Sequence, residues 1–461
     1  VKDRAIAFPR GKVLGGSSAI NGSLFVRGQK QDYETWGQMG NRGWSYDDVL
    51  PYFRKMEDRQ AGDTTFRGQG GPLHISDIHE KHPLCEAFMD GAVSLGIPRN
   101  PDYNGAVQEG VAYYQRTIRN GRRWSAAHAY LRPAMKRDNL HVISRADVSA
   151  ITFDGKRASG VTFRAGGNPY HAKPGREIIL CAGAIGSPHL LQLSGVGDPG
   201  HLKSIGIEVS HALPGVGEGL QDHYAVRVAA RVKGISTLNA RARGLRLGLE
   251  IMRWFATGKG LLAFSPAHVA TFMRSRPSLE VPDLQFVFTP ASYTAGMIGQ
   301  LERQPGMTTG VWQLRPDSKG FVRARTASVR DAPDIQPHYL KEKTDQTAMI
   351  EGLKWCRKLL STEPLNPYRD YESLPGANVV SDDEILDYIR GNGATVYHAV
   401  SSCRMGTDPQ AVVDDRLRVH GLSGLRIIDA SVMPTMPSGN TNAATLMVAE
   451  KGADLVLADY R

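Results

Sequence analysis

Residues 9–23 have the sequence PRGKVLGGSSAINGS, in which glycines and serines surround two basic residues, Arg10 and Lys12. Glycine removes the side chains that would keep a ligand away from the backbone, and backbone N–H groups bind phosphate oxygens well. This composition predicts a loop that holds a phosphate. Loops of this kind belong to nucleotide-binding domains, whose first strand and glycine turn lie earlier in the chain.

General acid–base chemistry needs a side chain that titrates near neutral pH, and the chain offers 14 histidines. A neutral imidazole, with an unperturbed pKa of about 6.5, can accept a hydroxyl proton near neutral pH. A single histidine in a sequence is more often structural than catalytic. Residue type alone therefore does not choose among the 14.

Asn440 and Thr441 stand at the start of a predicted C-terminal helix, TNAATLMVAEKGADLVLADY. The first N–H groups of a helix lack partners within the helix, and together with the helix dipole they favour negative charge. We expect this helix start to face an anionic ligand. The side chain of Asn440 can serve as the N-cap, as a ligand contact, or as both.

The segment GVGDPG, residues 195–200, matches the pattern GxGxxG, and Asp222 follows at a distance typical of a ribose-binding acid. A dinucleotide fingerprint needs a strand before its glycines and a helix that begins within them. Here a predicted helix comes first, and Pro199 lies inside the motif. We interpret the segment as a turn that ends a helix.

Several elements would position these groups. Residues 139–165 alternate apolar and polar side chains around Asp154 and Gly155, which predicts a β-meander. REIILCAGA, residues 176–184, is a nearly continuous apolar run and predicts a strand buried on both faces. Ser187 and Pro188 are the expected N-cap and first residue of the next helix, which Gly195 ends.

From about residue 229 to residue 395 the pattern changes to short strands followed by a helix, KTDQTAMIEGLKWCRKLLS. The segments LQFVFTPASY, TTGVWQLRP and KGFVRARTA predict an antiparallel sheet. LRIIDASVMP then predicts a strand before the C-terminal helix. A chain of 461 residues with this order favours two domains built from interleaved segments, of fold class α/β and α+β.

The formal net charge is +10, but the basic residues are mostly dispersed and form no long stripe or tail, which argues against nucleic-acid binding. One exception is ARARGLRLGLEIMRWFAT, residues 240–257, where Leu245, Leu249 and Met252 follow helical spacing among arginines. We expect this helix to pack its apolar stripe on the core of the protein. A peripheral contact with an anionic membrane surface is the alternative.

The four cysteines, Cys85, Cys181, Cys356 and Cys403, are far apart and form no CxxC pair. They predict reduced, mostly buried thiols rather than disulfides or a metal site, and a cytoplasmic location, with the periphery of the inner membrane left open. No apolar run approaches the ~18 residues that cross a bilayer.

Five segments together resemble the glucose–methanol–choline (GMC) oxidoreductases, a family of FAD enzymes. They are PRGKVLGGSSAINGS, GAIGSPHLLQLSGVG (183–197), PGVGEGLQDH (214–223), and TVYHAVSSCRMG with MPSGNTNAATLMVAEK near the C-terminus. The resemblance covers essentially the whole chain and is nearest to the choline and aliphatic alcohol dehydrogenase branch. It implies a discontinuous FAD domain whose Rossmann βαβ unit should precede residue 1, so that the numbered chain begins within that domain.

The resemblance also implies which residues contact FAD. The loop residues line the pyrophosphate and the flavin edge, the backbone of Val148 meets the adenine, and the helix start at Thr441 faces the flavin. Ile20 matches the position of a histidine that binds FAD covalently in some members, so we expect noncovalent FAD. The implied cofactor-binding residues are Val13, Gly15, Gly16, Asn21, Gly22, Ser23, Leu24, Val148, Tyr397, Asp429, Ala430 and Thr441.

Catalysis is assigned by the same resemblance to His398, in the segment VYHAVSS, and to Asn440, 42 residues later. His398 is expected to accept the hydroxyl proton of a primary alcohol, and Asn440 to hydrogen-bond the alcohol oxygen. His223 and His420 are weaker candidates for the base. Ala399, Ser401, Ser402 and Ala444 replace residues that are Pro, Gly, Thr and Pro in relatives.

The implied domains are an FAD-binding domain of residues 1–75, 120–228 and 396–461 and a substrate-binding domain of residues 76–119 and 229–395. The apolar segment LLAFSPAHVATFMRS, residues 261–275, is expected to line the substrate pocket. The partners are a small alcohol and an electron acceptor, either a quinone or O2. Alternatives on the same fold are an O2-using oxidase, a non-redox lyase that keeps FAD structurally, and a flavin-free scaffold.

Overall fold

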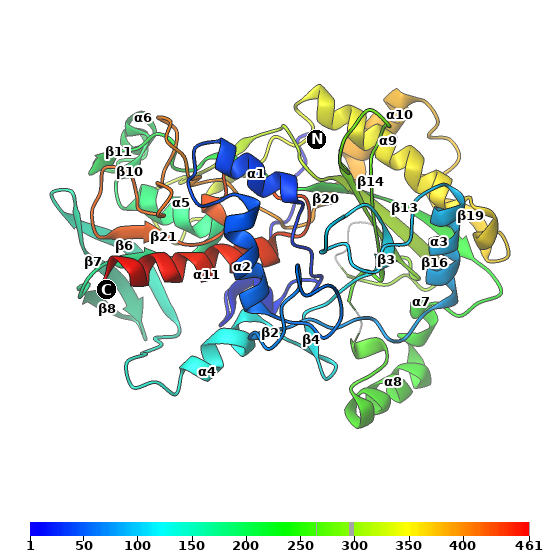
Figure 1. The fold of residues 1–461 in the computed structure, drawn as a ribbon. Helices are drawn as coiled ribbons and strands as arrows, with labels where there is room; N and C mark the ends of the chain where they lie inside the picture. The colour runs from blue at the N-terminus through cyan, green and yellow to red at the C-terminus, as the bar shows by residue number, and fades with distance from the viewer. Residues whose placement is uncertain (264, 295–298, 461) are drawn as a thin grey trace.

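The structure is a computed structural model that describes residues 1–263, 265–294 and 299–460. Figure 1 shows an elongated molecule in which a large antiparallel sheet lies towards one end and the C-terminal helix towards the other. The described strands of the large sheet pair in the order β19-β13-β16-β15-β14-β3, with β20 also beside β13. Their bounds are β3 Gly110–Tyr113, β13 Tyr224–Val232, β14 Val269–Met273, β15 Leu284–Thr289, β16 Gly306–Gln313, β19 Arg369–Leu374 and β20 Ala394–Thr395.

This sheet is covered by helices α3 (Pro83–Ser94), α9 (Lys343–Leu360) and α10 (Asp382–Asn392). Leu353 and Leu359 of α9 are fully buried against apolar strand residues such as Phe286 and Val311. The segments 284–293 and 308–316 form the strands that the alternation predicts. Residues 319–327 also form a strand, β17 (Gly320–Arg323), but this strand pairs with β12 (Glu218–Leu220) and β18 (Asp334–Gln336) in a separate sheet.

The second core surrounds the C-terminal helix α11 (Thr441–Asp459), which packs on α2 (Tyr46–Met56). Two short parallel strands, β9 (Ile178–Leu180) and β21 (Leu425–Ile427), run beneath it and lead towards helices α5 (Gly183–Leu193) and α11. Strand followed by helix is the α/β arrangement that nucleotide-binding domains use. The division of the chain into two domains at the stated residues stays a prediction.

The meander predicted for residues 139–165 is present as β6 (Ala146–Asp154) and β7 (Arg157–Ala165), joined at Gly155 and extended by β8 (Asn168–Ala172). The buried strand predicted from REIILCAGA is shorter than expected, and Ile179 is exposed. That part of the prediction was wrong, because β9 is paired only with β21 among the described residues.

The helix predicted to have Ser187 as its N-cap and Pro188 as its first residue begins five residues earlier, at Gly183. Proline inside a helix leaves the carbonyl four residues before it without its usual N–H partner. Here that carbonyl, of Ala184, accepts the hydroxyl of Ser402 instead, which explains how Pro188 is tolerated. The helix ends at Leu193 with Ser194 as its C-cap, and Gly195 follows in the left-handed conformation, as the interpretation of GVGDPG as a helix-ending turn requires.

The helix predicted within residues 240–257 forms as α7 (Leu238–Arg241) and α8 (Gly244–Thr257). The expectation that α8 packs its apolar stripe on the core was wrong, because no residue of α8 is buried. Its packing contacts use the opposite side of the helix, as described below.

The remaining helices and strands connect these parts. They are η1 Gly16–Ala19, α1 Lys30–Gln38, β1 Glu57–Asp58, β2 Leu73–His74, β4 Ile118–Arg119, β5 Arg122–Arg123, η2 Ala127–Leu131, α4 Arg132–Ala134, β10 Val196–Gly197, α6 Pro199–Ser204, β11 His211–Ala212, η3 Leu261–Ala263, η4 Glu363–Leu365 and η5 Ala430–Val432.

Candidate active site

The two residues predicted to act in catalysis lie side by side. His398 follows β20, Asn440 immediately precedes α11, and the His398 Nε2 and Asn440 Nδ2 atoms are 3.0 Å apart. His398 is buried, and the ring of Trp312 on β16 packs edge-on to it. An imidazole and an amide in contact form a pair that can bind one hydroxyl oxygen from two sides.

A chain of hydrogen bonds fixes which nitrogen of His398 carries its hydrogen. His223 Nε2 lies 2.8 Å from the carbonyl oxygen of Leu314, which can only accept, so His223 Nε2 must carry the hydrogen. In a neutral imidazole the other nitrogen is then an acceptor. His223 Nδ1 is 2.9 Å from His398 Nδ1, so His398 donates from Nδ1 and its Nε2 keeps a lone pair.

The amide of Asn440 is held from its other side. Gln285 on β15 donates from Nε2 to Asn440 Oδ1 at 3.2 Å and to the Tyr114 hydroxyl at 2.8 Å. The Asn440 amide nitrogen therefore points to His398 Nε2, which has the lone pair to receive it. Asn440 occupies the N-cap position of α11, but its side chain makes no capping hydrogen bond. The first N–H groups of α11 thus have no cap from Asn440.

The backbone of His398 is anchored by Asp222, which the structure places behind the histidine. Asp222 accepts the His398 N–H at 2.7 Å and also the hydroxyl groups of Thr395 and Tyr339. Tyr397, which precedes His398, has a φ of 67°, in the left-handed region that costs a residue other than glycine about 1–3 kcal/mol. The hydrogen bonds of Asp222 stabilise the strained turn that positions His398.

Burial sets the protonation of this cluster. It lowers the pKa of His223 to about 4 and holds the pKa of His398 well below its ordinary value, to which the neighbouring His223 and Arg10 also contribute. Burial raises the pKa of Asp222 to about 6, against the hydrogen bonds that favour its charged form. Both imidazoles are therefore neutral at neutral pH, the state in which His398 Nε2 can accept a proton.

The Gly/Ser loop adopts the open conformation that its composition predicts. Gly15 and Gly16 have φ of 91° and 54°, and a Cβ atom at Gly15 would lie 3.0 Å from that of Ala127, whereas one at Gly16 would meet no atom within 4 Å. Val13 and Ile20 are exposed. Lys12 pairs with Asp147 at 3.0 Å, which brings the loop beside Val148 of the meander.

The next residues, Asn21–Leu24, are held by polar contacts. Arg123 on β5 donates to Asn21 Oδ1 at 2.6 Å and to Ser23 Oγ at 2.8 Å, and Ser23 has a φ of 57°. A Cβ on Gly22 would lie 2.9 Å from the Pro266 side chain, so glycine is required there by the protein itself. A pocket of about 320 Å³ adjoins Gly22 and Ser23.

Asp429 and Ala430 lie just beyond β21, at the carboxyl end of the parallel pair. Asp429 accepts the N–H of Gly183 at 2.9 Å and the hydroxyl of Ser187, and thereby joins the starts of two strand–helix connections. In α/β sheets, ligands bind at this end of parallel strands.

These features fit FAD. The open space at Gly16, the exposed apolar side chains of the loop and the start of α11 without a side-chain cap suit a planar ligand with an anionic part. The residues that would hold it are those of the loop together with Val148, Asp429, Ala430 and Thr441. His398 and Asn440 would then stand beside the flavin, next to the start of α11.

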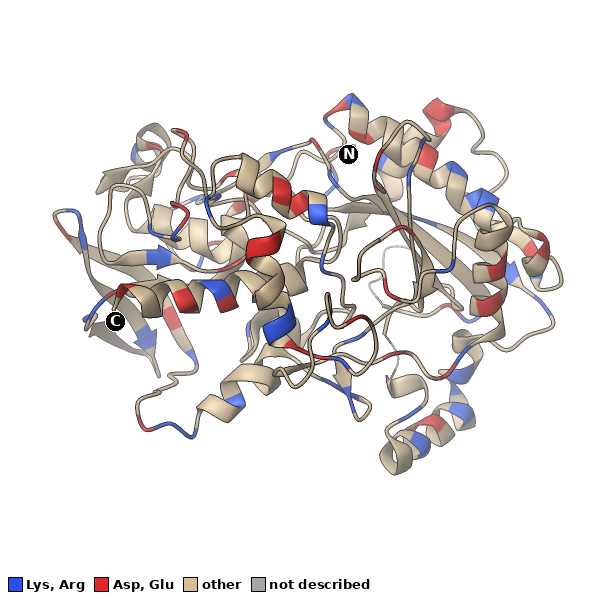
Figure 2. Ribbon diagram, in the orientation of Figure 1, with Lys and Arg blue, Asp and Glu red and all other residues tan. Residues whose placement is uncertain are grey.

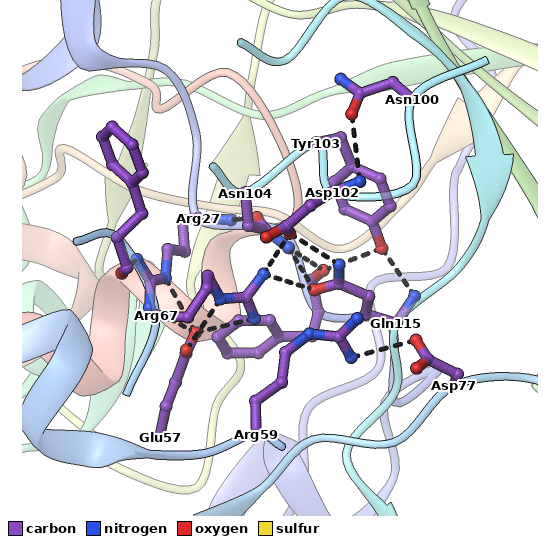
Figure 3. Close-up of polar contacts among 12 residues, drawn as sticks. Arg27, Glu57, Arg59, Arg67, Asp77, Asn100, Asp102, Tyr103, Asn104 and Gln115 are labelled. Atoms are coloured by element: carbon purple, nitrogen blue, oxygen red, sulfur yellow. Dashed lines mark hydrogen bonds and ion pairs between the residues drawn. The ribbon is translucent and has the colours of Figure 1, made fainter. Parts of the chain in front are cut away.

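A buried ion network anchors the segment that follows the Gly/Ser loop (Figure 3). Glu57 is fully buried and accepts from both Arg27, at 2.6 Å, and Arg67, at 3.0 Å. Arg67 also pairs with Asp102, and Asn104 donates to the Phe25 carbonyl at 3.2 Å. The network joins residues 25–27 to residues 57–67 and 102–104, and so fixes the end of the loop.

Sequence reasoning missed several residues of this cluster. The sequence offered His223 as a weaker candidate for the base and Asp222 as an acid after the GVGDPG turn, and both end the segment PGVGEGLQDH without an assigned place in the site. Gln285 and Trp312 lie within apolar strand segments that gave no sign of a polar role. One signal was available: the adjacent polar pair Asp222 and His223 directly precedes a strand of the large sheet. His420, the other weaker candidate for the base, contacts the Gly406 carbonyl at 3.0 Å.

The chain is similar in sequence and in fold to known oxidoreductases. Sequence models of the GMC oxidoreductase family match residues 1–225 and 316–449. Mitochondrial choline dehydrogenase of Homo sapiens is 41% identical over 98% of this chain and 76% of its own length, and oxygen-dependent choline dehydrogenase of Brucella anthropi is 40% identical over 98% and 83%. The crystal structure of pyridoxine 4-oxidase from Mesorbium loti superposes with a TM-score of 0.90 at 28% identity, covering 99% of this chain and 86% of that chain.

Proposed function

Since the chain belongs to the GMC oxidoreductase family and is an FAD-dependent enzyme acting on CH–OH donors, we propose that it oxidises a primary alcohol to an aldehyde with His398 as the base. The observation that carries the proposal is the contact of His398 Nε2, with its lone pair, with the amide nitrogen of Asn440. An alcohol oxygen that contacts both atoms would replace this hydrogen bond, giving its proton to Nε2 and accepting the amide N–H.

Bound FAD supplies the two-electron acceptor that takes the carbon-bound hydrogen of the alcohol with its electron pair. His398 takes the hydroxyl proton and becomes an imidazolium. Its Nδ1–H continues to donate to His223, which is neutral and keeps its acceptor nitrogen in place. The partner of His223 is the fixed Leu314 carbonyl, so the imidazole plane of His398 keeps one orientation throughout.

Asn440 stabilises negative charge that develops on the alcohol oxygen. Its carbonyl oxygen is already held by Gln285, so that only the amide N–H that contacts His398 Nε2 has to transfer to the alcohol oxygen when the substrate binds. A hydrogen bond to a charged oxygen contributes about 1.5–3 kcal/mol, which corresponds to ~10-fold to 10²-fold in rate. His398 thus accepts the proton, and Asn440 stabilises the negative charge on the alcohol oxygen.

Choline is the first alcohol to test, because relatives 41% and 40% identical to this chain are choline dehydrogenases. We propose that FAD is held noncovalently, because Ile20 offers no nucleophile to attach it. Denaturation in acid would then release all the flavin into the supernatant. Retention of flavin by the precipitated chain would contradict noncovalent binding.

The absorption spectrum of the purified FAD-loaded enzyme tests the function. We expect an oxidised-flavin spectrum that is lost when choline or another primary alcohol is added without O2. A flavin that no primary alcohol reduces would indicate a non-redox lyase, and a colourless protein that does not take up FAD would indicate a scaffold; either result contradicts the proposal. Reoxidation by O2 or by a soluble quinone then identifies the electron acceptor.

A further inference from the structure

Helix α8 follows α7 and projects from the body of the molecule near β4 (Figure 1). Among the described residues, the partly buried positions of the helix all lie on one side. Trp254 donates from its indole nitrogen to the Gly121 carbonyl at 2.9 Å, and Glu250 accepts the N–H of Leu261 at 2.9 Å. Leu247, Glu250 and Trp254 are the partly buried residues of the helix from Leu245 onwards, and they share one face.

The apolar face of α8 points in the opposite direction. Residues of an α-helix follow one another at intervals of about 100° around the axis, which places Leu245, Leu249 and Met252 roughly opposite Trp254. Leu245 is 91% exposed and Phe255 is 73% exposed, and Leu249 and Met252 are also exposed. Surface helices of globular proteins direct their apolar stripe towards the core. In α8 the stripe faces outwards and needs another partner.

The surroundings of this apolar face are basic, and Figure 2 shows Lys and Arg on α8 and beside it. Residues 241–259 contain five basic residues and one acidic residue. Arg241 and Arg253 form ion pairs with Glu80 and Glu250, so the basic character of this segment comes from Arg243, Arg246 and Lys259. The neighbouring β4–β5 hairpin adds Arg119 and Arg122, of which Arg122 lies over the Trp254 ring at 5.3 Å. Arg246 and Lys259 are both exposed.

We propose that α8 is a membrane-contact helix that lies in the surface of a bilayer containing anionic phospholipids. An outward apolar face bordered by arginines is the pattern of a helix that inserts its apolar side between headgroups while its cations bind lipid phosphates. The helix has 14 residues and is about 21 Å long, so it would lie in the interface rather than cross it. No helix within the described residues is both long and apolar enough to span a bilayer.

Charge favours this partner over a second copy of the chain. Two α8 faces that met would bring together two surfaces with the same excess of positive charge, whereas anionic headgroups neutralise it. The inference does not depend on the proposed reaction. It would place the pocket beside Gly22 and Ser23, which Trp254 and Leu262 also line, next to the membrane surface.

Co-sedimentation of the FAD-loaded, full-length enzyme with lipid vesicles tests the proposal. Vesicles of phosphatidylcholine with phosphatidylglycerol should bind the enzyme, vesicles of phosphatidylcholine alone should bind it much more weakly, and NaCl should reduce the binding. The double variant Leu249→Ser/Phe255→Ser should lose more than ~10-fold in partition coefficient. Arg246→Gln and Lys259→Gln should each lose about 5-fold.

Val380→Ser is the matched control, because Val380 is 71% exposed and lies just before the N-cap of α10, outside α8. Its vesicle binding should equal that of the unmodified enzyme. The proposal is overturned if the enzyme binds neither kind of vesicle, or if the α8 variants bind as well as the control. It is also overturned if Leu249→Ser/Phe255→Ser dissociates an oligomer in size-exclusion chromatography while leaving vesicle binding intact, since a second copy would then cover α8.

A tryptophan placed at residue 255 reports the environment of this face independently of affinity. The emission of Phe255→Trp, after subtraction of the unmodified enzyme, should be that of exposed indole in buffer and should shift to the blue with anionic vesicles. Val380→Trp should not shift. A blue emission of Phe255→Trp already in buffer would mean that protein covers α8 and would overturn the proposal.

Discussion

The Nδ1 atoms of His223 and His398 lie 2.9 Å apart, and since two lone pairs would repel, one of them must carry a hydrogen. The Leu314 carbonyl, 2.8 Å from His223 Nε2, settles which one. A carbonyl that lies outside the reacting groups thus determines that His398 Nε2, and not Nδ1, presents a lone pair beside Asn440.

Removal of His223 should therefore slow flavin reduction without affecting FAD binding. His223→Leu leaves the buried Nδ1–H of His398 without an acceptor, which costs about 1.4–2.8 kcal/mol and predicts a ~10-fold to 10²-fold slower anaerobic reduction by alcohol. The measurement is stopped-flow absorbance, which separates the limiting rate from substrate affinity. The limiting rate should fall and the affinity should stay nearly constant.

Two companion variants make this prediction specific. His223→Asn retains an acceptor close to the Nδ1 position and should recover part of the rate lost in His223→Leu. His420→Gln alters a histidine whose ring contacts the Gly406 carbonyl, and it should reduce its flavin at the unmodified rate. Equal rates for His223→Leu and the unmodified enzyme would contradict the role of His223.

The dependence of activity on pH should differ from that of an ordinary histidine. Burial holds the pKa of His398 well below 6.5, and only the neutral imidazole accepts a proton. Activity is therefore lost as pH falls through this lowered pKa, and kcat/KM should be nearly constant from about pH 6.5 to pH 8. A fall in kcat/KM centred above pH 6.5 would show that the base has an ordinary or raised pKa.

Asn440→Ala should reduce the rate of flavin reduction less than loss of the base. The expected decrease is ~10-fold to 10²-fold, because the variant loses one hydrogen bond to a charged oxygen. Asn440→Asp keeps the shape but cannot donate to an alcohol oxygen, and should be at least as slow as Asn440→Ala. A rate for Asn440→Asp equal to that of the unmodified enzyme would contradict the donor role of the amide.

The buried network of Figure 3 predicts a large effect on stability. Glu57→Gln leaves Arg27 and Arg67 buried without their shared carboxylate, and removal of one partner from a buried ion pair costs about 3–5 kcal/mol. Urea unfolding measures this change. Glu351→Gln, in a half-exposed pair with Lys354, is the control and should change the free energy of unfolding by less than about 0.5 kcal/mol. Similar changes in both variants would contradict the network's role.

Local patterns in the sequence predicted much of the fold. The alternation of residues 139–165 predicted the meander, and the apolar runs at residues 284–293 and 308–316 predicted central strands of the large sheet. The sequence did not predict which strands pair with one another, because pairing joins segments that lie far apart in the chain. KGFVRARTA therefore formed a strand in a sheet other than the one expected.

The helix α8 shows a different limit. Its apolar spacing was clear from the sequence, but periodicity gives the existence of an apolar face and not the direction in which the fold turns it. Similarly, the contact of His398 with Asn440 could be predicted only through the family resemblance. Gln285 lies on β15, and His223 directly precedes β13. Only the pairing of these strands in the large sheet brings the two residues to one site.

The most direct test of the account is the anaerobic reduction of FAD-loaded His398→Ala by a primary alcohol, followed by stopped-flow absorbance. Loss of a general base predicts a rate slower by ~10²–10⁴-fold, with the oxidised-flavin spectrum before mixing unchanged. Reduction at the unmodified rate would place the base elsewhere in the protein and would contradict the assignment of His398.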